Sequence, residues 1–244
     1  MKRIISLLFS SFFLCMWTTF AQAQELNPSN VIRISNCTID EGYTLQEVVD
    51  RARELSEEDS DNQPDGIYFR QPIYTSAEYQ ENWDFQLALY YPSYVEMASR
   101  RIAAGNSSRG RLPISCGNAT TINSYVVHQG DSFPNQTGML TRFCRLDEGN
   151  LRSSYNRIGT IAENYAEAGS NLSVQMNVRG LGGQLQGPND YGIAVVGSSI
   201  EAVMERLDMR RNGFRAELGN RSSSGASCDR WSLWVTHRIF QTNN

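Results

Sequence analysis

The chain is short of lysine and histidine. Its only lysine is Lys2, and its 244 residues include two histidines, His128 and His237. Acidic residues outnumber lysine and arginine by 26 to 22, and the arginines stand among neutral residues. Nucleic acids bind to clustered basic charge, so this composition argues against a nucleic-acid partner.

Cysteine is also sparse, and the cysteines never occur as a close Cys-x-x-Cys pair. Structural zinc sites use such pairs, so we expect no metal site. One cysteine lies in the apolar N-terminal run, and four remain after it, at positions Cys37, Cys116, Cys144 and Cys228. An even number of cysteines in an exported chain is typical of a protein with two disulfides.

Long apolar runs are confined to the N-terminus. The stretch Ile4–Phe20 is apolar, Lys2 and Arg3 precede it, and Ala21-Gln22-Ala23 follows it. This pattern predicts a signal peptide over residues 1–23, cleaved after Ala23. A retained membrane anchor is the alternative, because the run approaches a spanning length. We therefore expect a periplasmic or secreted protein with no membrane span after cleavage.

Two stretches of the chain resemble each other. NCTIDEG, residues 36–42, is echoed by FCRLDEG, residues 143–149, and further matches follow at an offset close to 107 residues. These matches pair Ser115-Cys116 with Ser227-Cys228, and His128 with His237. The spacing predicts a tandem repeat. We assign residues 24–30 to an N-terminal segment, 31–129 to the first repeat, 130–138 to a linker and 139–240 to the second repeat.

Each repeat is predicted to run strand, helix, strand, strand, helix, strand, which is the α+β order called ferredoxin-like. The β-branched stretch 31–39 suits a strand, and Thr44 with Glu47 forms a capping box for the first helix. In the second repeat Asn150 occupies the capping position. In this fold the first and last strands are antiparallel neighbours. That geometry favours Cys37–Cys116 and Cys144–Cys228 over the two other pairings.

Two consecutive units of this kind resemble the dimeric α+β barrel superfamily, in which two ferredoxin-like units pack sheet to sheet. The order of cysteine, acidic-glycine turn, helix, aromatic strand and closing cysteine is also similar to a group of small exported bacterial proteins of unknown function. The resemblance implies an intramolecular barrel that behaves as a pseudo-dimer, either monomeric or weakly self-associating. The superfamily contains haem-degrading and cofactor-independent monooxygenases, chlorite dismutase-like haem enzymes, and stress or binding proteins.

Aromatic residues gather in the first repeat between positions 68 and 94, whereas the matching stretch of the second repeat holds Tyr191 alone. This asymmetry suggests an aromatic-lined pocket with Arg70 or Asp84 as a polar anchor, and ordinary core packing is the alternative. A haem enzyme of the superfamily would need an axial histidine. The candidate ligand-binding residues are Arg70, Tyr74, Trp83, Asp84, Tyr90, His128 and His237.

No catalytic constellation is recognisable in the sequence, because no Ser-His-Asp or Cys-His arrangement can be assigned. The leading interpretation is a non-enzymatic protein, without cofactor, that binds a small apolar or aromatic ligand or a protein partner. The first alternative is an oxygenase-like or haem-dependent enzyme of the resembled superfamily that uses His128 or His237. The second alternative is a structural component of the cell envelope.

Overall fold

The computed structural model describes residues 26, 28–57, 63–75, 82–105, 111–131, 134–147, 150–182, 190–217 and 225–242. The expected signal peptide, residues 1–23, lies outside the described residues. Within these ranges no helix is long and apolar enough to cross a membrane.

The described elements follow one order twice. The first half of the chain contains β1 (Asn30–Ile39), α1 (Leu45–Glu57), β2 (Gly66–Tyr74), β3 (Phe85–Tyr91), α2 (Tyr94–Gly105), β4 (Ile114–Cys116) and β5 (Thr120–His128). The second half contains β6 (Gln136–Leu146), α3 (Leu151–Glu167), β7 (Ser173–Arg179), β8 (Asp190–Gly197), α4 (Ile200–Arg211), β9 (Ala226–Cys228) and β10 (Ser232–Gln241).

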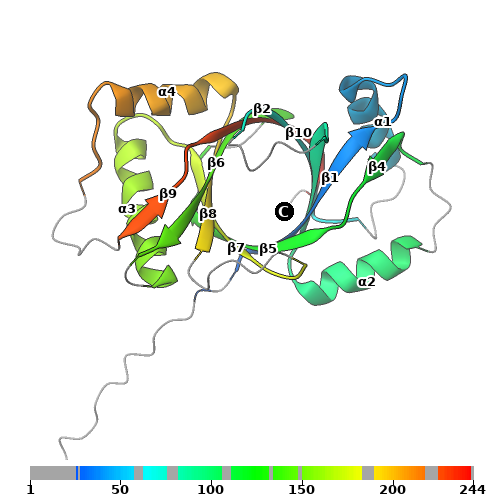
Figure 1. Ribbon diagram of the computed structural model, residues 1–244, viewed down its shortest axis with the longest axis horizontal. Coiled ribbons are helices and arrows are strands. Elements are labelled where there is room, and N and C mark those ends of the chain that lie inside the picture. The colour runs from blue at the N-terminus through cyan, green and yellow to red at the C-terminus, as the bar shows by residue number, and fades with distance from the viewer. Residues whose placement is uncertain are drawn as a thin grey trace, which may run out of the picture.

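Eight of these strands close into a barrel. Antiparallel pairing runs in the order β2-β3-β1-β5-β7-β8-β6-β10, and β10 pairs with β2 to complete the ring. The two halves therefore meet along two seams, β5 with β7 and β2 with β10. Viewed along the barrel, α1 and α2 lie outside the ring beside the first half, and α3 and α4 lie outside it beside the second (Figure 1). The predicted α+β barrel within one chain is confirmed.

Side chains alternate between the barrel lumen and the helices, because successive residues of a strand point to opposite faces. On β10, Leu233 packs into the core beneath α3 and α4, and Ile239 packs into the core beneath α1. Trp234, between them in sequence, faces the lumen, where it contacts Met139 and Ala194. The main hydrophobic cores thus lie between barrel and helices, and the lumen is lined by a separate set of residues.

The helices begin where the sequence predicts. The backbone N–H of Thr44 donates to the Glu47 carboxylate at 2.8 Å, and the Glu47 N–H donates back to the Thr44 hydroxyl at 3.3 Å. Asn150 caps α3 by accepting from the Ser153 N–H at 2.9 Å. These caps satisfy N–H groups that a helix leaves unpaired at its start, so both predicted starts are confirmed.

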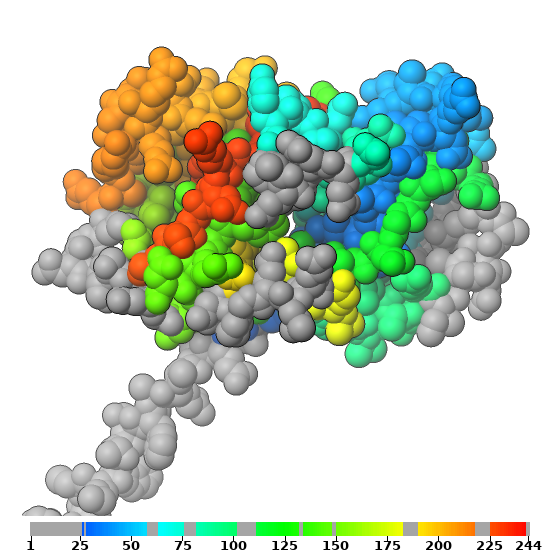
Figure 2. All heavy atoms as spheres, viewed as in Figure 1, coloured from blue at the N-terminus to red at the C-terminus, as the bar shows by residue number. Residues whose placement is uncertain are grey.

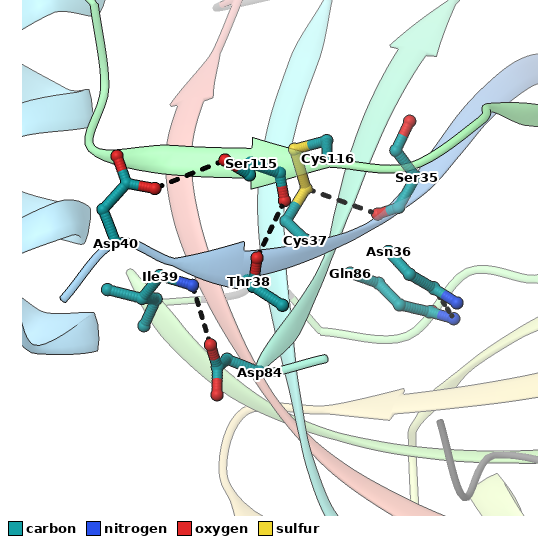
Figure 3. Close-up of a disulfide and its surroundings, with 10 residues drawn as sticks. All are labelled: Ser35, Asn36, Cys37, Thr38, Ile39, Asp40, Asp84, Gln86, Ser115 and Cys116. Carbon is teal, nitrogen blue, oxygen red and sulfur yellow. Dashed lines mark hydrogen bonds between the residues drawn. A yellow bond between two sulfur atoms is a disulfide. The ribbon is translucent and has the colours of Figure 1, made fainter. Parts of the chain in front are cut away.

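The repeated Cys-x-x-Asp motif is explained by its bonding. Disulfides join Cys37 to Cys116 and Cys144 to Cys228, which confirms the favoured pairing. In each half the aspartate three residues after the first cysteine accepts a hydrogen bond from the serine that precedes the second cysteine. Ser115 donates to Asp40 at 3.3 Å and Ser227 donates to Asp147 at 3.2 Å, and Figure 3 shows the first of these pairs. The motif therefore holds β4 and β9 against the ends of β1 and β6.

Candidate functional site in the barrel lumen

One end of the barrel contains a cavity of about 380 Å³, called here the lumen cavity. The space-filling view along the barrel shows the molecule hollowed at its centre, between the cyan segment of β2 and the yellow segment that follows β7 (Figure 2). The apolar side of its lining includes Trp83, Met139, Phe143 and Trp234, and the polar side includes Asn36, Gln86, Asn177 and Asp190. Both halves of the chain contribute to this lining.

Two tryptophans form one wall of the lumen cavity. The rings of Trp83 and Trp234 are stacked, with centroids 6.0 Å apart and planes 10° from parallel. The indole N–H of Trp234 donates to the Thr141 hydroxyl at 2.7 Å. The Trp83 indole nitrogen and the Asn177 side-chain oxygen are buried without a hydrogen-bond partner among the described residues. Buried polar atoms are normally paired, so these two atoms are candidates to contact a ligand.

Arg70 lines neither the lumen cavity nor a second cavity at the other end of the barrel, but it contacts Tyr90, which lines the second one. On β2, Phe69 packs into the core beneath α1, so its neighbour Arg70 faces the lumen. Arg70 is only 8% exposed, and it donates to the Tyr90 hydroxyl at 2.6 Å. Its Nε is buried without a partner, and no carboxylate pairs with it in the described part of the chain. A buried, unpaired cation is costly, which marks Arg70 as a candidate anion site.

The second cavity has a volume of about 740 Å³ and includes Tyr68 and Tyr90 in its lining. The two rings meet edge to face, with centroids 5.2 Å apart. Burial raises the pKa of Tyr68 to about 12, and the neighbouring Tyr90 adds to this effect. Tyr68 is therefore neutral near pH 7 and provides no counter-charge for Arg70.

The structure brings Arg70 and Tyr90 together and places Trp83 in the lumen cavity, but it puts two other candidates elsewhere. Asp84 accepts a hydrogen bond from the Ile39 backbone N–H at 2.7 Å and lies exposed beside the disulfide (Figure 3). Tyr74, at the end of β2, is 68% exposed. Neither residue lines the lumen cavity.

The two histidines also lie outside both cavities. His237 is 7% exposed and shares the outer face of β10 with Leu233 and Val235. Burial lowers its pKa, and the nearby positive charge of Arg53 lowers it further. His128 follows a β-bulge at the end of β5, where its Nε2 lies 2.9 Å from the Asn171 side-chain oxygen. Their matched sequence positions therefore do not bring them to a common site.

The second half contributes site residues that the sequence did not single out. Asp190 is the one carboxylate among the described residues lining the lumen cavity, and its partner Arg145 lies 3.3 Å away. The Arg179 guanidinium lies 5.8 Å from the centre of the Phe143 ring. The alternation of polar and apolar residues along β7, SVQMNVR, is the signal that could have indicated an inward-facing Asn177.

Comparison with known proteins adds only remote similarities. No family model matches the chain, and no curated protein matches it. A "putative monooxygenase" from Lactobacillus acidophilus has a TM-score of 0.46 at 11% identity, covering 87% of this chain and 95% of that one. A chlorite dismutase variant from Candidatus Nitrospira defluvii has a TM-score of 0.48 at 10% identity, covering 86% and 92%. A heme-binding protein from Thermus thermophilus has a TM-score of 0.45 at 10% identity, covering 86% and 91%.

These findings contradict the leading interpretation of the sequence, a non-enzymatic protein that binds an apolar ligand or a protein partner. The similar structures are described as "putative monooxygenase", "chlorite dismutase" and "heme-binding protein". They agree better with the alternative, an oxygenase-like or haem-dependent enzyme. The physical reason for the error is that aromatic content alone does not distinguish a binding pocket from a reaction site.

The haem-dependent form of this alternative requires an axial ligand, for which the sequence offered His128 or His237. His237 is directed away from the lumen, and His128 is held by Asn171 at the end of β5. Neither imidazole reaches the lumen cavity. The residues lining that cavity therefore do not fit a histidine-ligated haem.

Proposed function

We propose that this protein is an oxygenase-like enzyme that needs no cofactor and binds its substrate in the barrel lumen. The observation that carries the proposal is the buried Arg70 guanidinium, which has no carboxylate partner among the described residues and donates to Tyr90 in the lining of the second cavity. A cation in a site of low dielectric favours the ionised form of a bound acid. Arg70 would thus hold a phenol or enol as its anion.

Such an anion is the form that reacts with dioxygen without a metal. For a phenol with a free ring position, the net reaction is phenol plus O₂ giving quinone plus water. One oxygen atom becomes the new carbonyl, and the other leaves as water with the phenolic hydrogen and the ring hydrogen. Asp190, the described carboxylate in the lining, is the candidate to accept the phenolic proton. The stacked pair Trp83 and Trp234 provides a flat apolar wall for the ring.

The test is oxygen uptake by the protein with a panel of monocyclic and polycyclic phenols, in the presence of a metal chelator. We expect quinone formation that the Arg70→Met variant lowers by at least 100-fold, since one charge-assisted contact to a developing anion is worth roughly 10²–10³ in rate. Arg211→Met is the matched control, because the Arg211 side chain is 82% exposed. Uptake no faster than the spontaneous reaction, or equal rates in wild type and Arg70→Met, would refute the proposal.

A titration with haemin separates the two forms of the enzyme hypothesis. We expect no Soret band that depends on His128 or His237, because neither lines the lumen cavity. A band present in wild type and lost in His237→Gln would instead replace the cofactor-free proposal by the haem-dependent one.

We further infer that the chain is exported and consists of two ferredoxin-like repeats, residues 31–129 and 139–240. The identical order of elements in the two halves and the equivalent Asp40 and Asp147 contacts support the repeat. Two disulfides support an oxidising compartment. N-terminal sequencing of the protein isolated from its native host tests the export, with Gln24 expected as the first residue.

A further inference from the structure

Two further cations, the half-buried Arg142 and the buried Arg206, lie outside the barrel, between its second half and the helices α3 and α4. Leu140 and Cys144 on β6 pack into the core beneath these helices, so Arg142, between them in sequence, faces the same way. Arg206 on α4 is only 8% exposed. The lining of the lumen cavity includes Arg142 as well as Met139 and Phe143, but the Arg142 guanidinium is stacked on Trp231, which packs against the core beneath α3 and α4.

Each of these arginines is stacked on an aromatic ring. The Arg142 guanidinium lies 4.3 Å from the centre of the Trp231 ring, and the Arg206 guanidinium lies 4.1 Å from the centre of the Tyr165 ring. Stacking of this kind stabilises a cation through its flat face. It leaves the N–H groups at the edge of the guanidinium free to donate hydrogen bonds.

One nitrogen of each guanidinium lacks a partner. The Arg142 Nε and the Arg206 Nη1 are buried without a hydrogen-bond acceptor among the described residues, and neither side chain forms an ion pair there. Buried guanidinium groups are normally paired with carboxylates, and leaving one unpaired costs free energy. Two unpaired cations on one face of the same half therefore require an explanation.

The two positive charges also repel each other. Burial is the main cause that lowers the pKa of Arg206, to about 10, and the charge of Arg142 lowers it further. Burial likewise lowers the pKa of Arg142, with an added contribution from Arg210, which is exposed. Both groups remain protonated near pH 7, so the repulsion persists. Only a negative charge between or beside them would relieve it.

We propose that Arg142 and Arg206 form a binding site for an oxyanion, a phosphate or carboxylate group whose oxygen atoms accept hydrogen bonds from both guanidinium edges. Arginine presents its N–H groups in a fork that matches such anions. Arg142 is half-buried and Arg210 is exposed, so an anion can approach from the Arg210 side. The aromatic rings would hold the two forks in place before the anion arrives.

The test is thermal unfolding of residues 24–244 in inorganic phosphate, phenyl phosphate or acetate, against chloride at the same ionic strength. Binding to the folded state alone raises the melting temperature by roughly 5–10 °C at a hundredfold excess over the dissociation constant. We expect a saturable rise with at least one oxyanion. A rise with phosphate alone would identify a free phosphate ion as the ligand. A rise with phenyl phosphate alone would identify a phosphate ester, and a rise with acetate alone would identify a carboxylate. An equal, non-saturating rise in every salt would overturn the proposal.

Variants localise the effect. Arg206→Met is expected to abolish the saturable rise, and Arg211→Met, on the exposed side of α4, is expected to keep it. Arg142→Lys keeps the charge but loses the fork, so we expect at least a tenfold weaker affinity by calorimetry. The Arg142→Lys variant tests the site even if Arg206→Met does not fold. An unchanged affinity in Arg142→Lys together with an unchanged rise in Arg206→Met would exclude this site.

Discussion

Replacing Cys144 and Cys228 together by alanine removes the disulfide that spans 84 residues of the second half. In the chain-entropy description, a cross-link stabilises a protein by restricting its unfolded state, and a loop of this length corresponds to about 4.5 kcal/mol at 25 °C. For a chain of this size we expect the melting temperature to fall by roughly 9–18 °C. Alanine is chosen because Cys144 is only 3% exposed, where a serine hydroxyl would add its own desolvation cost.

The first disulfide is the internal control. Cys37 and Cys116 are separated by 79 residues, so the same description predicts losses for the two pairs that differ by less than about 0.1 kcal/mol. Cys37 is fully buried, as Cys144 nearly is, and both partner cysteines are exposed, so the packing lost is also similar. Urea unfolding of the two double variants measures both losses. A loss below about 1 kcal/mol, or losses that differ by more than about 2 kcal/mol, would refute the entropic account.

Two further predictions concern other parts of the molecule. Burial lowers the pKa of His237 in the folded state, so the unfolded chain binds a proton at this residue first as the pH falls. The free energy of unfolding should therefore decrease as the pH drops below about 6.5. Urea unfolding at a series of pH values should show a smaller decrease for His237→Met. Gly138→Ala should destabilise the protein by about 1–3 kcal/mol, because a Cβ there would lie 2.7 Å from the Ile200 Cα at the start of α4. Gly159→Ala on α3 is the matched control: the new Cβ would be 3.5 Å from Val127, so calorimetry should show a gain of about 0.5–1 kcal/mol. A destabilised Gly159→Ala, or a neutral Gly138→Ala, would contradict the packing described here.

Local chemistry made much of the fold predictable. Thr44 with Glu47 and the single Asn150 marked helix starts because caps depend on a few neighbouring residues. The cysteine pairing followed from which strands lie side by side, and the register Cys37 opposite Cys116 agrees with that reasoning. Closure of the ring did not follow from the residues, because nothing in β2 or β10 specifies its partner, and it was expected only from the resemblance to a superfamily.

The lumen was less predictable than the fold. The alternation of residues along β10 places His237 on the same face as Leu233 and Val235. Which face of the strand is turned to the helices depends on how the barrel closes, and the alternation does not predict that. Trp83 and Trp234 stack although they are distant in sequence, and no local pattern links them. Asp84 attracted attention as a carboxylate among aromatic residues, yet the structure uses it to bind a backbone N–H beside the disulfide.

The two seams that join the halves affect how the chain reaches its native state. As the first half leaves the ribosome, β2 and β5 have each formed only the pairings available within that half, because β10 and β7 are made later. Until then both strands are open edges, and the inward faces of four strands have nothing to cover them. Strand β10 pairs with both β2 and β6, so the ring can close only after β10 has been made. A nascent chain of this protein therefore carries an unfinished sheet until β10 is made, and this is the interval in which a chaperone would have the most to protect.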